Sequence, residues 1–323
     1  MPNLTVAVLG PPGYAKDLGK KGTSTDITLY NLKRGSDSVT FIEPTRYPEK
    51  IAPLFFAVSM ADRAILVVDE VHAAFGETVL MLGCVGIARG YLILKNYLTR
   101  EQLLPLIRGT VVEGYEVFEG NLNGLRDVLL DEAAARGGGQ AVSGVSGAGT
   151  VPIDHFFNVK GIGTVVLGTV ARGIVRPHDM VQVLPIGKQV QVRSIQKLDD
   201  DADIAFEGDR VGLALKGIEA GELDRGYVLS SDPTIRSTAA ISGQLEMVNY
   251  WKIPLRVGMS IHVGHWMQFL SGKIEMVGDR NGDRRPQVTI RLDREVVHPP
   301  GARVILHYLE GGKLRVVGFM SLP

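Results

Sequence analysis

The chain has 323 residues, of which 45% are hydrophobic and 22% are charged, a composition typical of a globular protein with two or three domains. Lys and Arg together number 35, as do Asp and Glu, so no overall positive charge draws the molecule to nucleic acid. The one cysteine excludes an internal disulfide bond and a zinc site built from cysteines. We expect a cytoplasmic protein, because the sequence carries neither a signal-peptide pattern nor an apolar stretch of 18 residues.

The first 136 residues alternate between apolar runs and helical patterns. Continuous apolar runs of this kind are typical of buried parallel strands, and helices between them cover both faces of the sheet. The pattern alone allows a Rossmann-like, flavodoxin-like or GTPase-like α/β domain. Strands are expected over residues 4–9, 39–42, 64–68, 91–94 and 115–118, and helices over 49–60, 73–88, 100–108 and 122–136.

Residues 137–149 are rich in glycine and serine, which predicts a flexible linker that lets the first domain move unless an interface holds it. After the linker, β-branched and aromatic residues are interrupted by glycines, a pattern that favours short strands and turns. We therefore predict small β-barrels over 150–231 and 232–323, the second with a hairpin turn at residues 279–283.

The order of residues in the first barrel is more informative than their period. The run GIGTVVLGTVARGIV over 161–175 is followed by GDRVGL over 208–213 and DRGYVL over 224–229. This succession resembles the second domain of the elongation factor Tu family, and the resemblance extends loosely over the third domain and partly over the first. It implies an α/β plus all-β chain, with a P-loop GTPase-like, mostly parallel sheet domain followed by two small β-barrels.

Within this family, the segment KKGTSTDIT over residues 20–28 looks most like the selenocysteine-specific elongation factors. Members carry aminoacyl-tRNA to the ribosome, with the aminoacyl end against the second domain and the T-stem against the third. The resemblance therefore implies aminoacyl-tRNA or the ribosome as a partner and a role in protein biosynthesis. It implies no membrane and no DNA as partners.

The residues with which this family binds phosphate and magnesium are altered. A phosphate loop reads Gly-x-x-x-x-Gly-Lys-Ser/Thr after the first strand, and its amides and lysine bind phosphates while its hydroxyl binds magnesium. Here the second glycine is Ala15, the hydroxyl residue is Asp17, and two prolines remove amide donors. The sequence has no room for the helix that should follow, and Ser24 stands in place of the magnesium-binding threonine. The vestigial nucleotide-binding residues are Gly10, Gly13, Lys16, Asp17 and Ser24.

Three further sequence motifs differ from those of the family. Asp-x-x-Gly-His becomes EPTRY over 43–47, the guanine-reading Asn-Lys-x-Asp becomes KNYL over 95–98, and Ser-Ala-Lys becomes FEG over 118–120. Each missing hydrogen bond to a charged group weakens binding by about 1.5–3 kcal/mol, and about 1.4 kcal/mol is a factor of ten in affinity. We predict a degenerate GTPase-like domain, a pseudo-GTPase that neither hydrolyses GTP nor binds it tightly. No catalytic residue, metal site or cofactor is expected.

Two alternatives stay open at this point. Weak binding of GTP or GDP with Mg²⁺ would make the chain an atypical GTP-binding translation factor with a remodelled phosphate loop. If the chain binds neither nucleotide nor tRNA, it would be a protein-binding scaffold. Because the helix after the loop is missing, the sheet face that it covers should be apolar and open. We therefore expect a docking cleft for a protein partner near residues 10–22.

Overall fold

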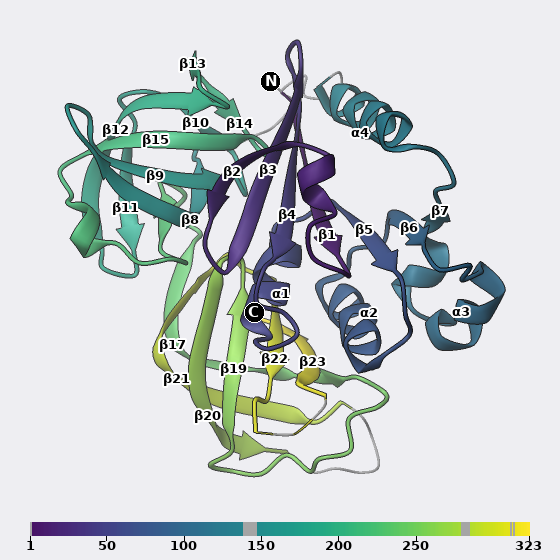
Figure 1. The fold of residues 1–323 in the computed structure, drawn as a ribbon. Coiled ribbons are helices and arrows are strands. Elements are labelled where there is room, and N and C mark those ends of the chain that lie inside the picture. Colours follow the sequence, from purple (N-terminus) through teal and green to yellow (C-terminus); the bar gives the residue numbers. More distant parts are fainter. Residues whose placement is uncertain (1, 138–146, 279–284, 311, 313) are drawn as a thin grey trace.

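The computed structural model describes residues 2–137, 147–278, 285–310, 312 and 314–323, so most of the predicted linker and the turn predicted at 279–283 lie outside it. Within the described residues, a sheet covered by helices is followed by two bodies made of strands (Figure 1). This arrangement confirms the predicted fold class. None of the helices in this described part of the chain is long and apolar enough to cross a membrane.

The first domain is built on a seven-stranded sheet of order β2-β3-β4-β1-β5-β6-β7. From β4 to β7 the neighbouring strands are parallel, whereas β3 and β2 are added antiparallel at one edge. The strands are β1 (Asn3–Leu9), β2 (Lys20–Ser24), β3 (Ile27–Arg34), β4 (Asp37–Pro44), β5 (Arg63–Val68), β6 (Gly90–Leu94) and β7 (Glu116–Val117). The sequence pattern predicted five of them and missed β2 and β3.

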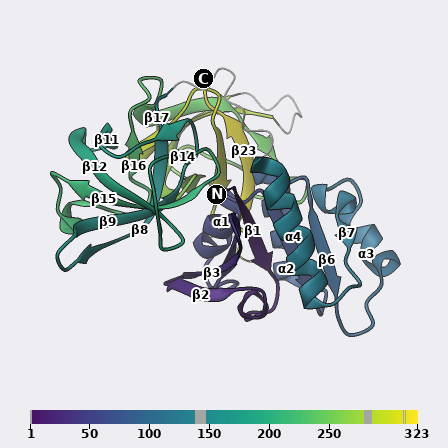
Figure 2. The ribbon, with the colours of Figure 1, turned by 90° about the horizontal axis from the view of Figure 1, so that it is seen from above.

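Both faces of this sheet are covered. On β1, Val6 and Val8 pack on one face with α4, while Ala7 and Leu9 pack on the other with α1 and α2, as the two-residue period of a strand requires. Figure 2 shows α4 lying along the sheet beside β1. The helices are α1 (Ala52–Ser59), α2 (Ala73–Val85), α3 (Arg100–Ile107) and α4 (Leu122–Gly137), and all four were predicted.

The second domain is an antiparallel sheet of order β11-β16-β8-β9-β15-β12-β13, which closes into a barrel because β11 also pairs with β12. A short pair, β10 (Ile174–Val175) with β14 (Ala205–Phe206), is added to it. The barrel strands are β8 (Thr150–Val159), β9 (Gly163–Thr169), β11 (Met180–Leu184), β12 (Lys188–Lys197), β13 (Asp200–Ala202), β15 (Arg210–Lys216) and β16 (Val228–Ser230).

The third domain is a seven-stranded antiparallel sheet of order β17-β21-β20-β19-β22-β23-β18. Its strands are β17 (Arg236–Gln244), β18 (Glu246–Met247), β19 (Ser260–His265), β20 (Gln268–Val277), β21 (Gln287–His298), β22 (Arg303–His307) and β23 (Val316–Ser321). Met267, Ile305 and Val316 of this domain share one hydrophobic cluster with α1 and α2 of the first domain. The first and third domains therefore pack through a common core.

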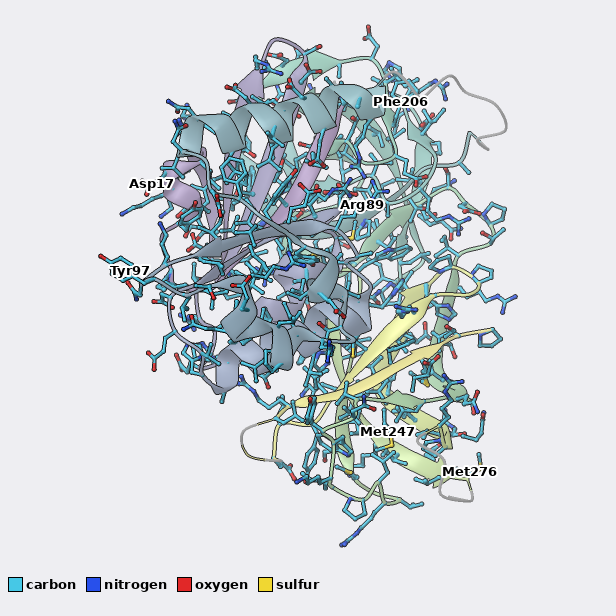
Figure 3. The ribbon with its side chains drawn as sticks, turned by 90° about the vertical axis from the view of Figure 1, so that its right-hand side faces the viewer. Asp17, Arg89, Tyr97, Phe206, Met247 and Met276 are labelled. Carbon is cyan, nitrogen blue, oxygen red and sulfur yellow. The ribbon has the colours of Figure 1, made fainter. Side chains whose placement is uncertain are left out.

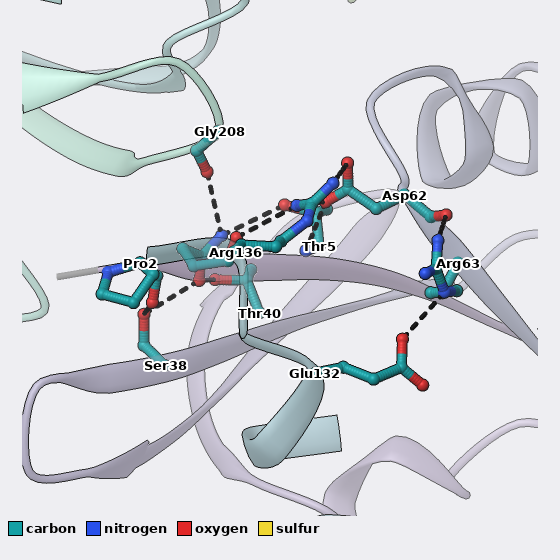
Figure 4. A network of polar contacts seen from close by, with 10 residues as sticks. Pro2, Thr5, Ser38, Thr40, Asp62, Arg63, Glu132, Arg136 and Gly208 are labelled. Carbon is teal, nitrogen blue, oxygen red and sulfur yellow. Dashed lines mark hydrogen bonds and ion pairs between the residues drawn. The ribbon is translucent and has the colours of Figure 1, made fainter. Parts of the chain in front are cut away.

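The expected open face near residues 10–22 is not found in the described residues. Leu125 and Leu129 of α4 are fully buried against the sheet strands, and Leu18 is fully buried in the same cluster. The far end of α4 is fixed too, because Arg136 forms two 2.6 Å contacts with the Asp62 carboxylate (Figure 4). α4 thus covers the sheet beside this loop, so the uncovered apolar face expected from the missing helix is absent from the described residues. Hollows lie only beside the segment, one lined by Tyr14 and Asp17 and another by Lys20 and Lys21, and a protein partner at this loop stays a prediction.

Candidate functional site

The loop after β1 keeps the turn of a phosphate cradle. Gly10 has φ +120°, and a Cβ at this position would come within 2.1 Å of the Val67 carbonyl oxygen, so only glycine fits. Gly13 also has a positive φ of +93°. The helix that should follow is reduced to a single 3-10 turn, η1 (Ala15–Asp17). The loop therefore retains its first bend but presents no helix N-terminus to a ligand.

The cradle is occupied by a side chain of the protein itself. Glu43, at the end of β4, is only 4% exposed and accepts a hydrogen bond from the Gly13 amide. Burial raises the pKa of Glu43 above its ordinary value, although the amides of Gly13, Ala15 and Tyr14 and the charge of Lys16 act in the opposite direction. A carboxylate thus takes the place at which such a loop offers its amides to an anion.

The structure gathers only part of the predicted nucleotide-binding set. Gly13 and Lys16 lie beside Glu43, whereas Asp17 is exposed at the edge of the first domain (Figure 3). Ser24 bonds inside the β2–β3 hairpin, where its Oγ lies 2.9 Å from Thr28 Oγ1. In the described part of the chain, no group of three or more His, Cys, Asp or Glu side chains is arranged to hold a metal ion.

A pocket of about 1370 Å³ opens at the predicted base-reading motif, and Lys95, Leu98 and Phe118 are among its lining residues. The turn beside it is unusual, because Asn96 and Tyr97 both adopt left-handed conformations, with φ 53° and 61°. This turn leaves the Tyr97 side chain fully exposed (Figure 3). The pocket at this motif is therefore open, but position 98 has an apolar side chain where the family uses an acid to bind guanine.

A second hollow, the interdomain groove, lies between the β2–β3 edge of the first domain and strands β8, β9 and β15 of the second. Its volume is about 570 Å³. On the barrel side, Phe157 and Ile162 are 40% and 45% exposed. On the other side stand Lys20 and Lys21, which form no ion pair within the described residues. The groove thus combines apolar surface with the positive charges of Lys20 and Lys21, and the acidic Asp199 also lines it.

Comparisons with known proteins agree with this architecture. The chain is 36% identical to the uncharacterized protein MJ0325 of Methanocaldococcus jannaschii over the full length of both chains. Residues 163–230 match the family Elongation factor Tu domain 2. A selenocysteine-specific elongation factor of the same organism is 26% identical over 94% of this chain and 72% of its own. The chain belongs to the translational GTPase family. Its relatives place it among the members that resemble selenocysteine-specific elongation factors.

Solved structures of this family share the fold. Elongation factor SelB of Methanococcus maripaludis, in complex with the GTP analogue GppNHp, superposes with a TM-score of 0.81 at 21% identity and covers 99% of this chain and 78% of its own. A bacterial selenocysteine-specific elongation factor superposes with a TM-score of 0.80 at 19% identity, over 100% of this chain and 58% of its own. The resemblance read from the barrel motifs is thereby confirmed.

The sequence missed the residue that matters most at the loop. From the sequence, Glu43 is only the first position of the altered motif at 43–47, because a carboxylate also stands there in the family. Its contact with Gly13 spans thirty residues of sequence. The one available signal was the exchange of Asp for Glu, whose extra methylene lets the carboxylate reach further towards the loop.

Proposed function

We propose that this member of the family binds the acceptor end of an aminoacyl-tRNA in the interdomain groove and does so without a GTP switch. The observation that carries the proposal is the Glu43 carboxylate seated on the phosphate-loop amides. A covalently attached carboxylate is always present at its site, whereas a free phosphate must compete for the same donors. The loop also supplies no hydroxyl for magnesium and no helix N-terminus.

The groove supports the RNA half of the proposal. Single-stranded nucleic acid is bound where a positive surface follows the backbone and exposed flat or apolar side chains receive the bases. Lys20 and Lys21 supply the charge, and Phe157 and Ile162 supply the apolar surface. The family resemblance implies the aminoacyl end as the occupant, and the first barrel contributes the wall that would receive it.

Filter binding of aminoacyl-tRNA to the full chain, at several salt concentrations and with or without GTP and Mg²⁺, tests both halves. We expect the same Kd with and without GTP. Replacing both Lys20 and Lys21 with Ala should make the negative slope of log K against log salt shallower by about 1.4, since each single-strand phosphate contact contributes about 0.7 to its magnitude. Phe157→Ser should weaken binding at every salt concentration. Lys188→Ala is the matched control, because Lys188 pairs with Glu222 and does not line the groove.

The outcomes separate the parts of the proposal. Absence of tRNA binding at low salt would refute the RNA half. An affinity for tRNA that rises with GTP would refute the other half and support a second candidate, an atypical GTP-binding factor. One observation favours that candidate: the Lys16 side chain remains exposed beside the cradle.

A further inference from the structure

Arg225, in the turn before β16, joins the second domain to the first. Its Nη1 pairs with Asp26 Oδ1 at 2.6 Å and its Nη2 donates to Thr25 Oγ1 at 2.9 Å, both in the turn between β2 and β3. Its guanidinium also lies 5.0 Å from the ring centroid of Phe56 in α1. One side chain of the barrel therefore contacts both the β2–β3 turn and α1.

A buried chain of hydrogen-bond contacts in the barrel supports the contact between Arg225 and the β2–β3 turn. Thr25 Oγ1 lies 3.2 Å from His155 Nε2, and His155 Nδ1 lies 2.6 Å from Asp154 Oδ1, which also accepts from Arg210 Nη2 at 2.8 Å. Asp154, His155 and Arg210 are each at most 9% exposed. Burial raises the pKa of Asp154, but Arg210 and His155 outweigh it and hold this pKa below its usual value. These contacts therefore hold the His155 ring in place against Thr25 of the first domain.

Aromatic packing joins the first domain to the third. The Phe55 ring centroid lies 5.9 Å from that of Phe269 and 5.5 Å from that of His307, and Phe56 lies 6.1 Å from Phe269. The approach is close enough to require glycine at position 264, where a Cβ would come within 2.6 Å of the Phe55 ring. The two surfaces thus leave no room for a side chain between them.

An ion pair closes the same interface further along α2. Arg315 Nη2 lies 2.5 Å from Glu77 Oε2, and the Glu77 side chain is 2% exposed. Cys84 follows two helical turns later, on the same face of α2 as Glu77. Its carbonyl oxygen accepts from Arg303 Nη1 of the third domain at 3.3 Å. The single cysteine of the chain therefore lies against this interface, and it is 3% exposed.

These contacts hold two segments that follow altered motifs of the first domain. The turn at residues 25 and 26 follows the altered phosphate loop, and α1 follows the altered motif at 43–47. We propose that the first domain is fixed against both barrels in one arrangement that needs no nucleotide. The contacts of Arg225 with the first domain and of Phe55 with the third domain hold this arrangement. This inference goes beyond the proposed function, because it holds whatever ligand the interdomain groove takes.

Cys84 provides a reporter in the unlabelled full chain. Its rate of reaction with 5,5′-dithiobis(2-nitrobenzoate), together with the radius of gyration from small-angle X-ray scattering, measures opening of the interface. We expect the natural protein to react slowly, with the same rate and the same radius in the presence and absence of GTP and Mg²⁺. Gly264→Val, at the interface that buries Cys84, should raise the rate at least tenfold and increase the radius, and Arg225→Ala, at the contact with the second domain, should increase the radius.

Two controls make the result decisive. Lys188→Ala removes an exposed ion pair within the barrel and should change neither quantity. Leu213→Ala destabilises the barrel core without touching the interface, and it should leave the thiol slow under native conditions. A shift in rate or radius with GTP would overturn the proposal. So would unchanged values in both interface variants, or an acceleration in Leu213→Ala as large as that in Gly264→Val.

Discussion

Replacement of Glu43 with Ala tests the occupied cradle most directly. The change removes the acceptor of the Gly13 amide and empties a site where the side chain is only 4% exposed. A hydrogen bond to a charged group contributes about 1.5–3 kcal/mol. Because burial raises the pKa of Glu43, the charge itself is disfavoured in the folded state and the net loss should fall near about 2 kcal/mol. The stabilising part is therefore the acceptor and the filled volume.

The assay is calorimetric unfolding of the full chain with increasing sodium acetate or phosphate. In Glu43→Ala the freed amides should accept the added anion, and at ten times its Kd the anion restores about 1.4 kcal/mol. Glu43→Gln is the matched control, since it keeps size and an acceptor oxygen and should change the free energy of unfolding by less than about 1 kcal/mol. Equal stability of the Ala variant and the natural protein, or equal stabilisation of both by anions, would refute this account of the loop.

Three further predictions concern stability. His307 is fully buried, and burial lowers its pKa to about 3, so the unfolded chain takes up this proton at a higher pH than the folded chain does. The free energy of unfolding should therefore fall as the pH drops below about 6.5. His307→Leu should reduce this dependence when the free energy of unfolding is measured from pH 7 to 4. Leu129→Ala, on the buried face of α4, should cost about 2–5 kcal/mol in urea unfolding, and a loss below about 1 kcal/mol would contradict tight packing of α4 on the sheet. Asp154→Ala leaves buried Arg210 unpaired and should cost about 3–5 kcal/mol, measured likewise, whereas exposed Asp131→Ala should cost under about 1 kcal/mol.

The sequence predicted the elements whose side chains carry a clear pattern. Residues 4–9 and 64–68 are continuous apolar runs, and they form β1 and β5 in the centre of the sheet. β2 was missed because KKGTS has no apolar alternation, and four of its five residues are exposed. An edge strand of this kind is held by backbone pairing with β3, which composition does not reveal.

The site was less predictable than the fold because its contacts join distant parts of the chain. The loop residues were found from spacing alone, since a phosphate cradle is a local motif. Arg225 lies within a recognised barrel run, but its partner Asp26 is 199 residues away. The packing of α4 on the sheet was equally hard to predict, because its apolar residues predict a buried helix but do not show on which face of the sheet the helix packs. Long-range pairings of this kind need the folded structure.

The contact between the Glu43 side chain and the loop after β1 also constrains which substitutions can occur at both places. Glu43 and the shortened segment 10–22 satisfy one another, so a change in either leaves a buried group without its counterpart. Across descendants of the same ancestor, a longer loop with a restored second glycine should coincide with a shorter acid at position 43. Lineages that show one change alone should be rare.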